Sequence, residues 1–304
     1  MDVSGSPPWR IESRHDLADS FPTFLDALAT YLDRAGIKAK PPVAAIAVAG
    51  PVNAGTARFT NRGWDISERE LASVGFKKAV LVNDFEALAF AAEILVDADL
   101  RNIGSDVRGE KRGTVTILGP GTGFGVSCLA RYRDRSIPMA TEGGHMGFAP
   151  SDEAELAALR LMWKQSGRIS VERILSGSGL EHLYRTLEQL AGREAQAMSA
   201  ADISAQALRG EAGCRAALTM FCSIFGAVAG DLALAHGARG GVYIAGGIAQ
   251  KIEKLLIESP FRKRFEDKGR LSPYVAAIPT RLIVNGDVAM LGAARAGSSL
   301  ASAS

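Results

Sequence analysis

The segment Gly119–Gly125 places the tightest constraint on how this chain can fold. It carries four glycines in seven residues, follows the apolar run Val115–Leu118 and precedes the run Val126–Ala130. Two such runs around a glycine turn predict a β-hairpin. Glycine tolerates positive φ and has no Cβ, and successive backbone N–H groups can form a concave anion site. The hairpin is therefore a candidate phosphate loop, and an ordinary glycine turn remains the structural alternative.

Strands and helices are expected to alternate along the chain. This alternation predicts an α/β protein with mainly parallel sheets. Ser20 is expected to cap the first helix, which Gly36 ends, and capping boxes are expected at Ser67 with Glu70 and at Ser199 with Asp202. Buried strands are expected at 43–49, 79–82, 241–245 and 281–284, with further helices at 67–75, 85–95, 151–165, 178–190, 199–208, 215–236, 248–257 and 287–295.

Two domains are favoured by the length of 304 residues. The charged, glycine-punctuated segment 101–113 is the expected linker. The smaller α/β domain is expected to cover 1–110 and to be completed by a C-terminal helix at 287–304. The larger α/β domain is expected to cover 111–286.

Composition excludes several classes of function. The net charge is +2 with both signs interspersed, so nothing favours a nucleic-acid partner. The three cysteines have neither paired nor metal-ligand spacing, which fits a reducing compartment and no protein metal site. No apolar run reaches the ~18 residues of a membrane span, since Asp231 interrupts the best one, 225–235. A cytoplasmic protein without a membrane partner is expected, and a homodimer stays open.

Asn83 and Asp84 directly follow the predicted strand 79–82. Ligands of open α/β sheets bind at the carboxyl ends of strands. An aspartate there can take a proton from a substrate hydroxyl, and the asparagine can hold neighbouring hydroxyls. The alternative is that Asp84 only caps the helix that follows.

A second polar motif is Glu142-Gly-Gly-His145. The two glycines argue against a helix, and therefore against a metal pair spaced by three residues. A bent loop would instead bring Glu142 and His145 into one pocket, with Glu172 as a third polar side chain. Such a set suits the vicinal hydroxyls of a sugar. The alternative for His145 is an ordinary loop histidine.

Gly246 and Gly247 follow the predicted strand 241–245. Small residues at this place leave room for an adenine or a ribose. Close packing of the next helix would explain them equally well.

Taken in order, these motifs resemble those of bacterial glucokinases, and the resemblance covers about 20–295. It implies a two-domain actin-like, hexokinase-like fold of ribonuclease H-like domains with a cleft between them. It also implies transfer of the γ-phosphoryl of ATP to the 6-hydroxyl of glucose. The matching segments are 49–52, 60–64, Asn83-Asp84-Phe85, 119–125, 142–145, Glu172 with 175–177, 245–248 and 265–270.

The resemblance also implies a role for each candidate residue. Asp84 corresponds to the catalytic base, and ATP is the co-substrate, bringing Mg²⁺ with it. The glucose-binding set corresponds to Asn83, Glu142, His145 and Glu172. The nucleotide-binding set corresponds to Gly121, Thr122 and Gly123 in the second phosphate loop and to Gly246 and Gly247 in the adenosine site.

The start of the chain departs from the family pattern. The family opens with a hairpin that carries an Asp-x-Gly-Gly-Thr-Asn-x-Arg type of phosphate loop, and no such loop appears in Asp2–Trp9. A hairpin of roughly 20–30 residues is thus expected to be missing, which would leave strand 43–49 or its neighbour with an unpaired edge. We therefore expect weaker turnover than in a chain extended upstream. A catalytically impaired or dead sugar-binding or regulatory homologue, or a kinase for another hexose, are the alternatives. The related group with a cysteine-rich zinc motif is disfavoured.

Overall fold

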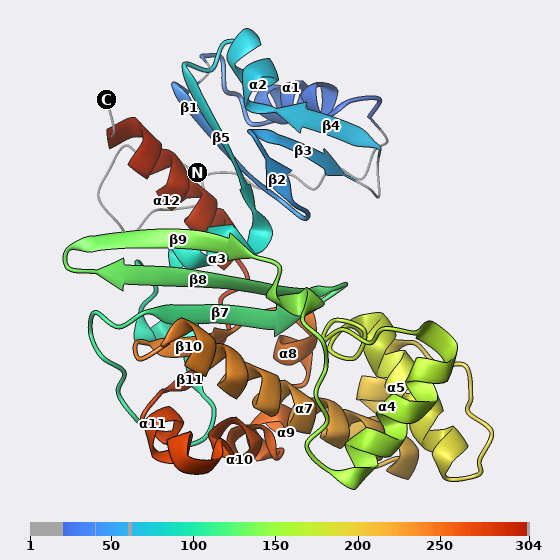
Figure 1. The fold of residues 1–304 in the computed structure, drawn as a ribbon. Coiled ribbons are helices and arrows are strands. Elements are labelled where there is room, and N and C mark those ends of the chain that lie inside the picture. The colour runs from blue at the N-terminus through green and yellow to red at the C-terminus, as the bar shows by residue number, and fades with distance from the viewer. Residues whose placement is uncertain (1–20, 40, 60–62, 303–304) are drawn as a thin grey trace. The chain divides into compact units, whose positions relative to one another are not determined.

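The computed structural model describes residues 21–39, 41–59 and 63–302 (Figure 1). The chain forms two compact units. Unit 1 extends to Leu95 and resumes at Gly286, and unit 2 is Val96–Asn285. The expectations that concern Asp2–Trp9, Ser20 and 60–62 lie outside the described residues.

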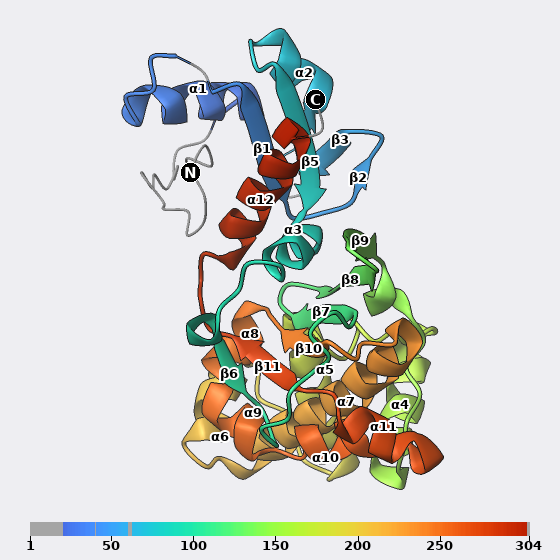
Figure 2. The ribbon, with the colours of Figure 1, turned by 90° about the vertical axis from the view of Figure 1, so that its left-hand side faces the viewer.

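A parallel pair of strands lies at the centre of unit 1. β1 (Val43–Val48) pairs with β5 (Lys78–Asn83), which confirms both predicted strands. α12 (Val288–Ser302) packs on both strands and on α3 (Asp84–Ala91) (Figure 2). The contact between the two helices is close, because a Cβ on Gly292 would lie 1.7 Å from the carbonyl oxygen of Ala87. The last helix of the chain therefore belongs to the same unit as its first strands.

Unit 1 also holds a small antiparallel sheet that the sequence analysis did not anticipate. Its strands, in the order β2-β3-β4, are β2 (Val52–Asn53), β3 (Thr56–Phe59) and β4 (Trp64–Ser67). Ser67 caps α2 (Glu68–Ser73) as predicted, its hydroxyl accepting the N–H of Glu70. α1 (Phe24–Arg34) has Thr23 as its N-cap, and Thr23 forms a capping box with Asp26.

Unit 2 is built on one six-stranded sheet. Its order is β6-β11-β10-β7-β8-β9. β7 and β8 form the predicted glycine hairpin, and β9 was not predicted. Only β10 runs parallel to its two neighbours, so the expectation of mainly parallel sheets is wrong for this sheet. The strands are β6 (Leu100–Asn102), β7 (Val115–Pro120), β8 (Phe124–Tyr132), β9 (Arg135–Thr141), β10 (Gly241–Ile244) and β11 (Thr280–Ile283).

The segment predicted as a linker starts inside this sheet. β6 pairs with β11, and Ile103 directly after it is fully buried. The compact units therefore divide between Leu95 and Val96, whereas the sequence analysis placed the boundary at 110.

The long helix α7 (Ala212–His236) forms the core of unit 2 (Figure 1). The ring of Phe225 meets those of Phe124 and Phe261 edge to face, at centroid distances of 5.8 and 5.1 Å. Gly237 ends the helix in a left-handed conformation, as predicted. The other helices of this unit are α4 (Glu153–Ser166), α5 (Gly177–Leu190), α6 (Ala200–Leu208), α8 (Gly247–Lys251), α9 (Glu253–Glu258), α10 (Phe261–Glu266) and α11 (Ser272–Ala276), with short 3-10 turns η1 (Asp97–Asp99), η2 (Gly143–His145) and η3 (Gly269–Leu271).

Within the described ranges, α7 alone is long and apolar enough to cross a membrane by length and composition. Asp231 interrupts the apolar run, as expected, but the helix as a whole remains apolar on average. Of its most apolar window, 72% is buried inside the chain, as in the core helix of a folded domain.

Candidate functional site

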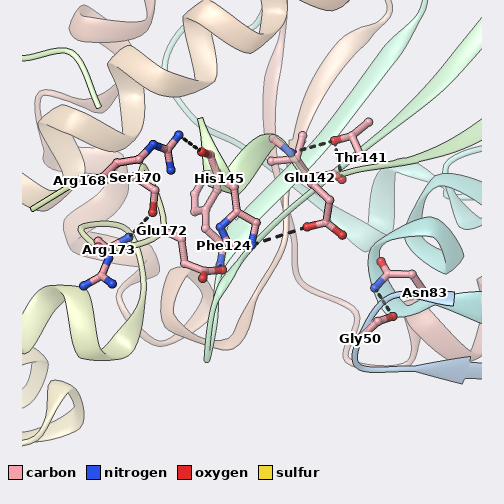
Figure 3. A network of polar contacts seen from close by, with 12 residues as sticks. Gly50, Asn83, Phe124, Thr141, Glu142, His145, Arg168, Ser170, Glu172 and Arg173 are labelled. Carbon is pink, nitrogen blue, oxygen red and sulfur yellow. Dashed lines mark hydrogen bonds and ion pairs between the residues drawn. The ribbon is translucent and has the colours of Figure 1, made fainter. Parts of the chain in front are cut away.

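Asn83 and Asp84 lie where β5 ends and α3 begins. The Oδ1 atom of Asn83 accepts the N–H of Phe85 at 2.9 Å and that of Glu86 at 3.3 Å, so Asn83 is the N-cap of α3. Its Nδ2 atom donates to the carbonyl of Gly50 at 2.9 Å (Figure 3). Asn83 therefore caps α3, the role that was the alternative for Asp84.

The carboxylate of Asp84 is half-buried at the first position of α3. Burial raises its pKa above the ordinary 3.8, and the hydrogen bonds from the backbone N–H of Phe85 and from Asn83 oppose that rise. A raised pKa makes a carboxylate a stronger proton acceptor while it remains ionised at neutral pH. Asp84 thus has the properties of a general base.

The glycine loop between β7 and β8 offers two free backbone donors. The N–H of Gly121 bonds to the carbonyl of Gly123 at 2.8 Å, and the carbonyl of Gly121 accepts the N–H of Gly177 at 3.0 Å. The N–H groups of Thr122 and Gly123 bond to no other described residue. Because Gly177 begins α5, the positive end of that helix lies beside the loop. The loop has the features of an anion site.

Glu142 and His145 are brought together by η2. A Cβ on Gly144 would lie 2.1 Å from the carbonyl oxygen of Phe124, so only glycine fits against β8 at that position. The Nε2 atom of His145 lies 3.8 Å from Oε2 of Glu142, and the side chains are 59% and 73% exposed. Both polar groups are therefore open to a ligand, as the two glycines between them suggested.

Glu172 joins this turn to the glycine loop. Its Oε2 atom accepts the N–H of Phe124 at 2.9 Å, and its own N–H donates to the carbonyl of Gly144 at 2.9 Å. A Cβ on Gly123 would lie 2.4 Å from the same Oε2 atom. Figure 3 shows Glu172 beside Phe124 and His145. The structure thus brings Glu172 together with both motifs.

Gly246 and Gly247 lie next to the strand that leads into the glycine loop. The N–H of Ala245 donates to the carbonyl of Leu118 at 2.9 Å. Gly246 has a φ of 92°, and a Cβ there would lie 2.3 Å from the carbonyl oxygen of Pro120. Gly247 begins α8 with open space around it. All the candidate nucleotide residues therefore belong to one region of unit 2.

The sequence analysis missed two residues that hold the η2 turn in place. Arg168 donates from Nη2 to the carbonyl of His145 at 2.6 Å (Figure 3). Thr141 donates to the carbonyl of Val126 at 3.0 Å and accepts the N–H of Gly143 at 3.3 Å. The position of Thr141 just before Glu142 was a usable signal, whereas no pattern in the sequence marks Arg168.

Among the residues that the structure describes, no group of three or more His, Cys, Asp and Glu side chains could hold a metal ion. The cysteines Cys128, Cys214 and Cys222 are free and buried. The site is therefore described by its hydrogen-bonding groups alone.

The raised pKa of Asp84 predicts a stability effect that depends on pH. Because the folded chain binds this proton more tightly than the unfolded chain, the free energy of unfolding falls as pH rises from 3.8 through the raised pKa. The ionised carboxylate is thus a stability cost at pH values above its raised pKa. We expect Asp84→Asn, which keeps an oxygen for the N–H of Phe85, to raise the free energy of unfolding at pH 7.5 and to raise it less at pH 5.

Urea unfolding at the two pH values measures this difference. Asp33→Asn, an exposed position in the same unit, serves as the control. A loss of stability in Asp84→Asn, or a gain that does not change with pH, would show that burial does not set the pKa of Asp84.

Comparisons with known proteins agree with this geometry. A family model described as Glucokinase matches residues 8–299. The glucokinase of Caulobacter sp. (strain K31) is 46% identical over 295 residues, which are 97% of this chain and 89% of that relative.

Solved structures give the same result. The crystal structure of a glucokinase from an Antarctic psychrotroph has a TM-score of 0.84 and 36% identity, and the match covers 92% of this chain and 87% of that one. A ROK family glucokinase from Streptomyces griseus, in complex with glucose and AMPPNP, has a TM-score of 0.59 and 19% identity. The match covers 92% of this chain and 90% of that one, and at this identity it shows the fold alone. With its actin-like two-domain fold, and on the match of its sequence over nearly its whole length, this chain belongs to the glucokinase family.

Proposed function

We propose that this chain transfers the γ-phosphoryl group of ATP to the 6-hydroxyl of glucose, with Asp84 as the general base. The observation that carries the proposal is the burial and the raised pKa of the Asp84 carboxylate. It is a half-buried carboxylate with a raised pKa at the carboxyl end of β5, and Asn83 relieves it of capping α3. It can therefore take the proton of the hydroxyl as the oxygen attacks phosphorus.

The sugar is held by hydrogen bonds to its remaining hydroxyls. Glu142 and Glu172 are acceptors, and the imidazole of His145 can donate or accept. Asn83 retains one Nδ2 hydrogen beyond its bond to Gly50 and can donate it to a hydroxyl. Because the Oε2 atom of Glu172 is occupied by the N–H of Phe124, its Oε1 atom is the one offered to the sugar.

The nucleotide phosphates are held by the glycine loop. The free N–H groups of Thr122 and Gly123 point to this role, as does the N-terminus of α5 at Gly177. Gly121 shapes the loop, and Gly246 and Gly247 leave room for the adenosine. Mg²⁺ brought with ATP supplies charge neutralisation at the phosphates when it is bound.

This function fits a cytoplasmic enzyme at the start of glycolysis, acting on glucose and ATP. Three free, buried cysteines are consistent with a reducing compartment. A net charge of +2 favours neither a nucleic acid nor a membrane surface as a partner.

Replacement of the base tests the proposal. We expect Asp84→Asn to lower kcat by about 10²–10⁴, since it keeps the shape of the side chain and removes the proton acceptor. Glucose affinity is expected to change much less. The measurements are steady-state ADP release and glucose titration by calorimetry.

Glu86→Gln is the matched control, because Glu86 is a half-buried carboxylate two residues away whose pKa burial also raises. It is expected to retain kcat. Equal kcat in Asp84→Asn and the parent chain would remove Asp84 from the reaction.

The sugar set predicts a different kinetic signature. We expect Glu142→Gln and His145→Ala each to raise the KM for glucose by about tenfold to a hundredfold, because a sugar hydroxyl then loses its hydrogen-bond partner. The KM for ATP should stay near its parental value. Both constants come from initial rates at saturating co-substrate.

Glu194→Gln, an exposed carboxylate in the same unit, is the control and should leave both constants unchanged. If both site variants kept parental glucose affinity, the sugar would have to bind elsewhere.

A further inference from the structure

A polar cavity lies in unit 2, apart from every residue assigned above to the sugar or the nucleotide. It has a volume of about 700 Å³. Its walls are the end of α4, one face of α5 and the segments that flank α5. The polar residues that line it include Arg173, His182, Arg185, Thr186, Arg193 and Gln165.

The cavity is strongly basic. No acidic residue lines it. Arg173 and Arg185 are exposed, and in the part of the chain that the structure describes neither guanidinium forms an ion pair. Arg193 is held by the buried carboxylate of Glu188 through bonds of 2.8 and 2.5 Å. Two of the three arginine charges are therefore uncompensated and face a concave surface, which concentrates anions.

The polar groups between the arginines are also arranged for a ligand. The Nε2 atom of His182 lies 2.7 Å from Oε1 of Gln165. Burial lowers the pKa of His182, and the charges of Arg185 and Arg173 lower it further, so both guanidinium groups lie close to a neutral imidazole. A neutral imidazole adds a hydrogen-bonding group to the cavity without adding a competing charge.

Thr186 is the second and independent observation. Thr186 is among the residues that line the cavity, and it is 1% exposed. Its hydroxyl has no hydrogen-bond partner among the described residues. A buried hydroxyl left without a partner costs free energy, so native chains usually satisfy it. Thr186 therefore adds a buried polar side chain to the wall of the cavity.

We propose that this cavity binds a small organic phosphate, separate from ATP, and that its occupation regulates the sugar and nucleotide site. Guanidinium groups bind phosphate through paired N–H donors, which matches Arg173 and Arg185. Only the regulatory part rests on the proposed function. The binding of the phosphate does not.

The cavity is connected to the site at two points. Arg173 directly follows Glu172, whose carboxylate bonds to Phe124. Ser178, which lines the cavity, lies with its hydroxyl 3.3 Å from that of Ser176, the N-cap of α5. The next residue, Gly177, bonds to the glycine loop. A ligand that shifts Arg173 or Ser178 therefore acts on residues adjacent to the candidate site.

Calorimetric titration with inorganic pyrophosphate tests the binding. The full chain is first saturated with glucose and a non-hydrolysable ATP analogue, so that the glycine loop is already filled, and ionic strength is held constant with chloride. We expect one saturable site in the parent chain. Arg185→Gln should weaken it at least about tenfold, the usual effect of losing a charged hydrogen bond.

Arg209→Gln, an exposed arginine of the same unit outside the cavity, is the control and should bind as the parent does. A second arm replaces pyrophosphate by glucose 6-phosphate, which distinguishes a phosphate ester from a free phosphate. Absence of saturable binding for both probes, or equal affinity in Arg185→Gln and the parent, would overturn the proposal. Neither result would affect the proposed kinase activity, which the Asp84 and Glu142 variants test separately.

Discussion

The hydrogen bond from the N–H of Phe124 to the carboxylate of Glu172 organises the candidate site of unit 2. It fixes a carboxylate against the first residue of β8, where the glycine loop ends. The backbone N–H of Glu172 also donates to the carbonyl of Gly144, in the turn that carries Glu142 and His145. One residue thus sets the distance between the loop proposed for phosphate and the turn proposed for sugar. Glycine is required at 144, where a Cβ would meet the backbone of Phe124, and a Cβ at 123 would displace the carboxylate of Glu172.

In unit 1, the end of β5 separates helix capping from the carboxylate of Asp84. Two adjacent polar residues share the start of α3, and the amide of Asn83 satisfies the exposed N–H groups of the helix. The carboxylate of Asp84 is left for chemistry, and its burial raises its pKa. The same burial makes the ionised group a cost to folding, which is a common property of catalytic residues. The role proposed for Asp84 therefore comes at a cost in stability.

Much of this arrangement could be predicted from the sequence, because strong local signals carried it. The hairpin around 119–125, the caps at Ser67 and Ser199 and the end of α7 at Gly237 all follow from glycine and side-chain capping chemistry. The strands β2 to β4 and β9 escaped prediction because they are short or mostly exposed, with charged residues such as Arg58 and Arg135 in them. Each of them pairs with a strand next to it in the chain, β2 with β3, β3 with β4 and β9 with β8, so the sequence analysis missed local hairpins rather than long-range pairs.

In the candidate site, too, the sequence predicted the residues but not their tertiary contacts. Residue types and glycine spacing indicated Glu142, His145 and Glu172, but not the partner of each polar atom. That Asn83 rather than Asp84 caps α3, and that Arg168 holds the carbonyl of His145, depend on tertiary geometry. The cavity lined by Arg173 and Arg185 likewise unites residues that no motif connects.

The most direct measurement is a crystal structure of the chain with glucose and a non-hydrolysable ATP analogue. The account predicts a glucose hydroxyl on the Oε1 atom of Glu172, with the N–H of Phe124 still on Oε2. It also predicts phosphate oxygens on the N–H groups of Thr122 and Gly123. Glucose bound away from Glu172, or phosphates that avoid the glycine loop, would contradict it.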